Sequence, residues 1–214
     1  QLNARTAYSL LRYVALPRTF FLPSVMHPDL LPHYTTPFDN MRDDHWSRIT
    51  GIHKNHPRYE TLRMRRTLPT NKGGSGIPVS DELAPHALLA SVKAICPHLK
   101  RYSPAAYDHL IQTLDTSDPL GVALAFRRVK GLHDWIAAQH TKESNASCPS
   151  LHKPPTAIPD TPQALLAAKQ TYSDHVFARN LAARTQIKLH QAYLQHDTIH
   201  CDDHTQMLSQ ASPG

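Results

Sequence analysis

The stretch SDELAPHALLASVKAI, residues 80–95, decides the fold class of this chain. Ser80 is a residue type that favours a helix N-terminus, and Asp81 and Glu82 place negative charge in the first turn, where the helix dipole favours it. Leucine, valine and isoleucine then recur at helical spacing and predict one buried face. The stretch therefore predicts a helix from Ser80 to about Ile95.

The same kind of start signal recurs three times downstream. Ser103, Asp118 and Thr161 are each followed by proline, which is favoured in a first turn because the amide at that position has no helical acceptor. These starts predict helices over residues 103 to about 114, 118 to about 140, and from 162 onward. The apolar positions expected in the core are Leu88, Leu89, Val92, Ile95, Leu110, Ile111, Leu114, Val122, Leu124, Phe126, Val129, Leu132, Trp135 and Ile136.

Two proline-rich segments lie outside this helical body. Residues 17–37 hold five prolines among large apolar side chains, and residues 142–162 hold five more. Proline disfavours the helical conformation of the residue before it, and the second segment has too little apolar surface to offset its conformational entropy. Both segments are predicted to be extended arms that become ordered on a partner surface. Residues 2–16, which precede them, have the spacing of a short amphipathic helix.

Residues 54–72 carry the densest positive charge of the chain, with Glu60 as their one acid. The residues that we assign to binding a partner or an anionic surface are Arg58, Arg63, Arg65 and Arg66. Acidic protein, anionic lipid headgroups and RNA phosphates would all suit them. Asp39 is expected to start the preceding helix, which runs to about Ile52, and the glycine-rich residues 72–76 are expected to form a flexible hinge.

The last predicted element is one continuous helix from Pro162 to about His200, which would be roughly 58 Å long. Its best apolar stripe consists of Leu165, Tyr172, Val176, Ala183, Ile187 and Leu194. A helix of that length exceeds what the other helices of this chain can cover, so we expect other chains to bury the stripe. Together these elements predict a mainly α fold: an irregular helical body of several short helices, Pro-rich extended arms and a long C-terminal helix. The predicted segments are 1–38, 39–76, 77–141, 142–161 and 162–214.

No motif in the sequence has the order that catalysis or cofactor binding requires. The residues that most resemble a metal site are His196, His200, Cys201 and His204, and we interpret them as a solvated helix end rather than ligands. The NKGGSG stretch at residues 71–76 lacks the residue order of a phosphate-binding loop and the strand that precedes one. We therefore expect no cofactor, no metal, no small-molecule substrate and no enzymatic activity.

Composition points to a basic protein of a reducing compartment. The net charge is +6 and the isoelectric point is near 9.3, less basic than expected of a dedicated nucleic-acid binder. Three widely spaced cysteines do not form a disulfide framework. The chain begins at Gln1, and Asp29 is its first acid, after three arginines. We interpret this start as that of a mature chain whose mitochondrial targeting segment has been removed.

These features predict a non-catalytic accessory (scaffold) subunit of a large mitochondrial membrane-associated energy-converting complex, such as ATP synthase or a respiratory complex. Such a subunit would lie against the inner membrane or on its matrix side and hold several protein subunits together. The alternative is a mitochondrial ribosomal protein that contacts rRNA through residues 54–72, and a third hypothesis is a metal-dependent enzyme that uses the C-terminal histidines.

Overall fold

The computed structural model describes residues 3–15, 21–144, 158–168, 181–189 and 191–192. These residues form helices and no strand, which confirms the prediction of a mainly α fold. The elements are α1 (Ala4–Leu10), η1 (Leu11–Ala15), α3 (Phe21–Val25), α4 (Leu31–Thr50), α5 (Tyr59–Thr67), η2 (Thr70–Lys72), α6 (Ser80–Tyr102), α7 (Pro104–Thr116), α8 (Val122–Ser144) and α9 (Pro162–Ala167). Residues 181–189 are also helical.

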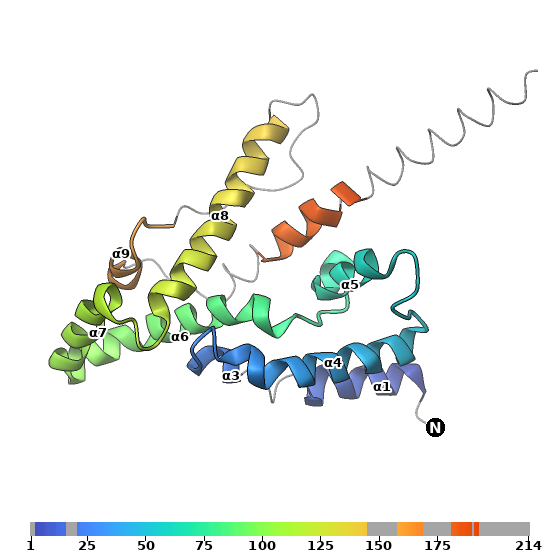
Figure 1. Cartoon of the computed structure of the whole chain (residues 1–214), viewed down its shortest axis with the longest axis horizontal. Helices are drawn as coiled ribbons and strands as arrows, with labels where there is room; N and C mark the ends of the chain where they lie inside the picture. Colours follow the sequence, from blue (N-terminus) through green and yellow to red (C-terminus); the bar gives the residue numbers. More distant parts are fainter. Residues whose placement is uncertain (1–2, 16–20, 145–157, 169–180, 190, 193–214) are drawn as a thin grey trace, which may run out of the picture.

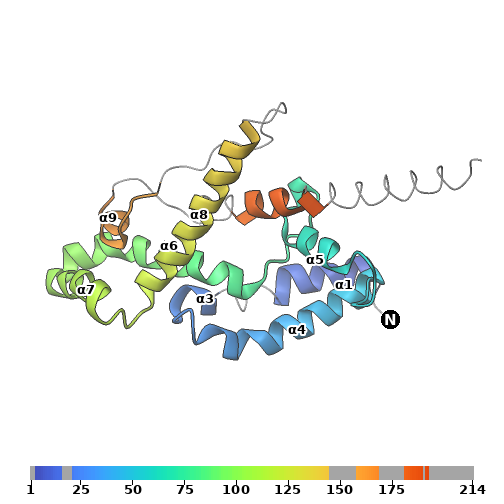
Figure 2. The same ribbon diagram turned by 45° about the horizontal axis from the view of Figure 1, so that its top comes forward.

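Helix α6 is the central element of the molecule. It contacts α3, α4, α7, α8 and α9. Figures 1 and 2 both show α7, α8 and α9 gathered around its C-terminal half, whereas α3 and the start of α4 lie along its N-terminal half and α1 and α5 lie beyond its N-terminal end. The helix over 181–189 lies near the start of α6 and near α5 in both views. The two halves of the protein therefore meet along one helix.

The start of α6 is capped by a side chain from another helix. The backbone N–H of Ser80 donates to Asp39 Oδ2 at 3.1 Å, and Ser80 Oγ donates to Asp39 Oδ1 at 2.7 Å. Asp39 lies inside α4, so the prediction that it starts its own helix is wrong, and the predicted boundary after residue 38 falls within α4. Its carboxylate instead joins α4 to α6.

The helix starts expected at serine, aspartate and threonine are found, with two differences in extent. Ser103 directly precedes α7 as predicted. Asp118 caps α8 from a distance, because its carboxylate accepts from the N–H groups of Ala123 and Leu124 at 3.1 and 3.0 Å, and α8 therefore begins at Val122. Helix α6 continues past Ile95 to Tyr102, with lysine and arginine in its last turn, where they complement the helix dipole.

The described part of the first proline-rich segment consists of two helical stretches joined by a turn over residues 26–30, so the prediction of an extended arm there is wrong. Helix α3 and the first turns of α4 fall within residues 17–37. Pro32 is in the first turn of α4, where a missing amide costs no hydrogen bond, and Pro37 is the only proline deeper in that helix. Leu31 and Thr35 are buried on the same face of α4. This burial offsets the bond that Pro37 removes.

The helix that starts at Pro162 is short, so the prediction of one continuous helix to about residue 200 is wrong. Its N-cap is Thr161, as expected, but α9 ends at Ala167 and the next residue, Ala168, has an extended ψ of 136°. Lys93 Nζ donates to the carbonyl oxygens of Leu165 and Leu166 at 2.9 and 2.7 Å, and also to that of Ala168. A cation from α6 thus takes up the carbonyls left without partners where the helix ends.

The main core lies between α6, α7, α8 and α9. Its buried residues are Leu88, Leu89, Val92, Cys96, Leu114, Val122, Ala125, Phe126, Val129, Ile158, Leu165 and Leu166. Most of these positions were expected from the sequence, but Ile95 is 51 % exposed and does not belong to the core. Ile158 shows that the end of the second proline-rich segment packs into this core, whereas residues 145–157 of that segment lie outside the described residues.

A smaller cluster joins the N-terminal helices to α5 and the loop before α6. It consists of Leu11, Trp46, Tyr59 and Ile77. The glycine-rich residues between α5 and α6 are bonded back to α5, because the N–H groups of Ser75 and Ile77 both donate to the carbonyl of Arg66. A Cβ at Gly74 would be 2.1 Å from the backbone oxygen of Leu68, so the close approach requires glycine. The segment expected to be a hinge is therefore a packed turn.

We expect Leu165→Ala to lower the free energy of unfolding by roughly 2–5 kcal/mol, because Leu165 is fully buried and its truncation leaves a cavity in the main core. Urea denaturation followed by circular dichroism measures this loss. Leu120→Ala is the control, because Leu120 is 48 % exposed and its truncation should cost less than about 1 kcal/mol. Equal losses in the two variants would mean that α9 does not belong to the fold.

Candidate functional site

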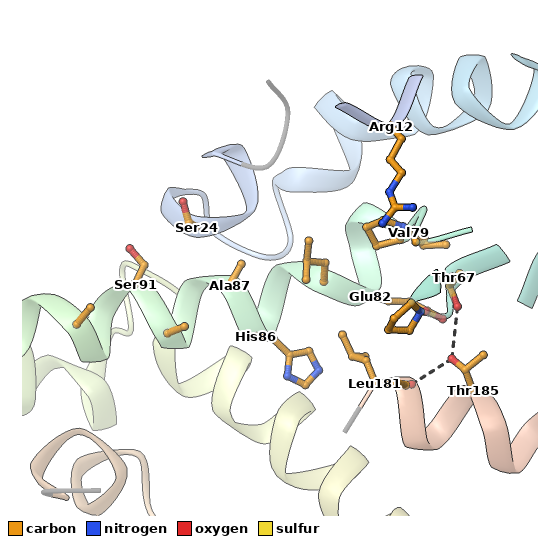
Figure 3. Close-up of a pocket in the computed structure, with 17 residues that line it drawn as sticks. Arg12, Ser24, Thr67, Val79, Glu82, His86, Ala87, Ser91, Leu181 and Thr185 are labelled. Carbon is orange, nitrogen blue, oxygen red and sulfur yellow. Dashed lines mark hydrogen bonds between the residues drawn. The ribbon is translucent and has the colours of Figure 1, made fainter. Parts of the chain in front are cut away.

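A cavity of about 720 Å³ lies beside the N-terminal half of α6. Its walls come from α3, η1, the end of α5, the loop before α6, and the helix over 181–189. Figure 3 shows α6 crossing the site, with Ser24 of α3 on one side and Leu181 and Thr185 on the other. The volume is that of a typical small-molecule site.

The walls are mainly apolar, and most of the side chains that α6 contributes are small. Ala87, Ala90, Ser91 and Ala94 line the cavity at spacings of three, one and three residues, which places them on one face of the helix. Larger side chains at these positions would fill the space. The cavity therefore exists because α6 presents alanine and serine where its other faces present leucine and valine.

Three ionisable side chains line the cavity. Glu82 pairs with Arg184, whose Nη2 is 2.6 Å from Glu82 Oε2. His86 is buried, and its burial, aided by the charge of Arg184, lowers its pKa from 6.5 to about 3, so the imidazole is neutral at physiological pH. Arg12 reaches the cavity from η1, and Figure 3 shows its guanidinium extending toward Val79.

Hydrogen bonds hold the helix over 181–189, which forms one wall of the cavity, in place. Thr185 Oγ1 donates to the carbonyl of Leu181 at 3.1 Å and lies 3.5 Å from the hydroxyl of Thr67 at the end of α5. The nearby buried residues Leu68, Ala182 and Leu189 form an apolar cluster. The helix over 181–189 is thus attached to both α5 and α6.

A second group of charges lies beneath α5, in the segment predicted to bind an anionic surface. Asp43 of α4 accepts from Arg66 Nη1 at 2.7 Å and from Arg42 Nη2 at 3.2 Å. Arg66 is 1 % exposed, and its guanidinium carbon lies 5.3 Å from the ring centroid of Trp46. Burial by itself would raise the pKa of Asp43, but the hydrogen bonds and charges of Arg66 and Arg42 outweigh burial and lower that pKa below 3.8.

The prediction that Arg66 faces an external anion is therefore wrong, because a carboxylate of the same chain neutralises it inside the protein. Arg63 lies 3.4 Å from both Asp43 and Glu60 and is 39 % exposed, so it is partly engaged. Arg65 is exposed and its Nε donates to the carbonyl of Gly73 at 3.0 Å. Arg58 is exposed. Only part of the basic segment is thus available to a partner.

The predicted C-terminal stripe is divided by the structure. Leu165 and Ile187 are buried by this chain, so the prediction that other chains bury them is wrong. The reason is that α9 ends at Ala167, so that α9 and the helix over 181–189 are separate helices, and each packs against other helices of this chain. Ala183 of the stripe is half-buried. The other stripe residues, Tyr172, Val176 and Leu194, and the metal candidates His196, His200, Cys201 and His204, lie outside the described residues.

Sequence reasoning missed the cavity altogether. The alanine and serine face of α6 is visible in the sequence as four small residues at helical spacing, which would have indicated a space beside that helix. The contribution of Arg12 could not be found this way, because it depends on where η1 packs. Within the described ranges, no three histidine, cysteine or acidic side chains gather as a metal site would require.

Comparison with known proteins supplies no relative. No protein-family model matches the chain, and neither a curated protein nor a solved structure matches it significantly. Among the described helices, none combines the length and the apolar character that a membrane span needs. The functional argument therefore depends on the surface and the cavity of this structure.

We expect Asp43→Asn to destabilise the protein by roughly 3–5 kcal/mol, because the buried Arg66 loses its counter-charge and Arg42 keeps only its pair with Asp39. Thermal and urea unfolding would measure the loss. Asp44→Asn is the matched control, since Asp44 is the next residue of α4 and is exposed. If both variants unfolded at the same urea concentration as the wild type, the buried cluster would contribute nothing to stability.

Protonation of His86 should make the fold less stable in acid. Its folded pKa of about 3 is below the unfolded value of 6.5, so the unfolded chain takes up the proton first and stability falls as the pH drops below 6.5. We expect the wild type to lose about 1 kcal/mol per pH unit relative to His86→Leu between pH 6.5 and about pH 5. His109→Leu, at an exposed position of α7, should keep the wild-type pH dependence.

Proposed function

We propose that this protein is a non-catalytic accessory subunit of a large mitochondrial membrane-associated energy-converting complex, such as an ATP synthase or a respiratory complex. In this role it holds several neighbouring subunits together, peripheral to the inner membrane or on its matrix side. It has no small-molecule substrate of its own in this role. The proposal is carried by the distribution of exposed apolar side chains.

Large apolar side chains are left exposed mainly at the N-terminal end of the protein. Of the eleven such residues among those described, three lie elsewhere, at Ile95, Tyr102 and Leu120. The other eight are Leu10, Tyr13, Val14, Phe21, Val25, Leu30, Tyr34 and Met41. This concentration supports contact with other proteins, because single exposed apolar residues are ordinary but gathered ones mark interfaces.

The exposed residues follow the helical repeat on each element. Leu10, Tyr13 and Val14 are three and four residues apart at the junction of α1 and η1, and Phe21 and Val25 are four apart on α3. Such spacing places each set on one face of its helix. Leu11 of η1 and Pro23 of α3 are buried, so these two elements contact the interior and also carry apolar side chains that face outward. A protein that used these helices only for its own core would not need the outward-facing side chains.

The charge of the same region supports the proposed location. Arg5 is exposed, Arg12 is half-buried, and Asp29 is the first acid of the chain. A basic, apolar N-terminal region suits the anionic headgroups beside which an inner-membrane complex lies. Anionic lipid would then be a secondary contact beside the protein subunits.

The alternative, a mitochondrial ribosomal protein, has its own support in the structure. Arg48, Lys54, Arg58 and Arg65 are exposed at the end of α4, in the loop that follows it and in α5. They are spaced along one end of the molecule and would suit phosphate contacts. Binding that weakens steeply with added salt is the property that would favour rRNA over apolar protein contacts.

We expect the double variant Tyr13→Asp and Tyr34→Asp to reduce assembly into the complex by at least about tenfold, because each charge would be buried in an apolar contact. The measurement is affinity purification of the tagged full chain from its native cells, with the partners identified and quantified by mass spectrometry. Tyr102→Asp is the control, since Tyr102 is equally exposed but lies at the far end of α6.

Recovery of inner-membrane complex subunits that the double variant loses would support the proposal. Recovery of ribosomal proteins in their place would favour the alternative. A wild-type chain that migrates alone as a monomer in native extracts would contradict both. Circular dichroism of the purified variants would show that the fold is intact.

A further inference from the structure

The proposed scaffold role gives no function to the cavity beside α6. Its apolar wall begins at Val79, directly before α6, and continues along the fifteen helical residues from Ser80 to Ala94. At 1.5 Å per residue this wall is roughly 22 Å long. A space that is long, apolar and bounded on one side by small side chains fits an extended alkyl chain better than a compact polar molecule.

One end of the cavity carries a positive charge that the described residues do not neutralise. Among the described residues, no carboxylate lies within ion-pair distance of the Arg12 guanidinium. Two tyrosines position this guanidinium: Nη1 donates to Tyr8 Oη at 3.3 Å, and the guanidinium carbon lies 5.1 Å from the Tyr13 ring centroid. The guanidinium lies across Gly76, where a Cβ would be 3.3 Å from Nη2. The glycine leaves room for the arginine at the cavity.

The other charges at the cavity cancel. Glu82 is paired with Arg184 at 2.6 Å, and the buried His86 is neutral. The charge that remains on the lining is therefore that of Arg12. A ligand that matches both properties of the site has an anionic group at one end and an apolar chain behind it.

We propose that this cavity binds a long-chain fatty acid, with the acyl chain along the alanine and serine face of α6 and the carboxylate on Arg12. The carboxylate can accept two hydrogen bonds from the planar guanidinium in a charge-assisted pair, which a neutral lipid cannot form because it has no negative charge. The chain would contact Ala87, Ala90 and Ala94. This inference does not depend on the scaffold role, because it concerns the interior of the chain and not its outer faces.

The test uses the purified, delipidated full chain and oleate as the probe. Isothermal titration below the micelle concentration should show saturable binding of about one oleate per chain. Arg12→Gln should weaken that binding about tenfold, the effect of losing one charge-assisted interaction. Arg127→Gln is the matched control, because Arg127 is exposed on α8 and remote from the cavity lining.

Two further variants test the position of the chain. Ala87→Phe would fill the middle of the cavity, and Ala94→Phe would fill one end of it. Ala94 is exposed, so its position should tolerate a larger side chain. Both should abolish or strongly weaken oleate binding while the thermal unfolding of Ala94→Phe stays that of the wild type. Ala138→Phe, an exposed alanine on α8, should bind oleate normally.

Several results would overturn the proposal. They are the absence of saturable oleate binding by folded protein, equal affinity for oleyl alcohol, or binding that neither alanine variant changes. Binding only to vesicles that contain anionic phospholipid, with none to monomeric oleate, would assign Arg12 to a membrane surface instead. A chain that fails to bind oleate but still copurifies with its complex would refute the fatty-acid site and leave the scaffold role standing.

Discussion

The buried carboxylate of Asp43 is the interaction on which the N-terminal half of this protein depends. Arg42 and Arg66 are almost fully buried, and a guanidinium cannot shed its proton to escape the cost of leaving water. Each must therefore be held against a counter-charge, and Asp43 supplies it to both. Helix α5 can pack on α4 only in the position that brings Arg66 to that carboxylate.

The same constraint extends to the cavity through two further carboxylates. Asp39, one turn before Asp43, caps the first residue of α6 and also pairs with Arg42 at 2.8 Å, so the cluster determines where α6 begins. Glu82 in the first turn of α6 then holds the helix over 181–189 through Arg184. Charge pairing thus positions α5, α6 and the helix over 181–189, which form three walls of a cavity whose lining is mostly apolar. Apolar contacts alone would not specify that arrangement so narrowly.

Sequence reasoning succeeded where the signal is local and failed where the partner is distant. Helix starts at Ser103 and Thr161 could be predicted because their signals are local: each precedes a proline in the first turn, and Thr161 also accepts from the N–H of Ala164. Arg66 was misassigned because its partner is 23 residues away, in a helix that the same reasoning started too late. The early end of α9 could not be predicted either, since it depends on Lys93, more than 70 residues earlier in the chain. Proline in the first turns of α4 was read as a sign of extended chain, although burial of Leu31 decides the conformation.

The contacts that bind α9 to α6 and α8 would persist if the chain were cut before α9. Ile158, Leu165 and Leu166 are buried among residues of α6 and α8, and Lys93 binds the end of α9. None of these interactions requires the peptide bonds between residues 144 and 158. A polypeptide cut in that interval would remain a single non-covalent particle, and the two pieces made separately could reconstitute it. The protein is thus suited to fragment complementation, with the piece from residue 158 onward as the smaller partner.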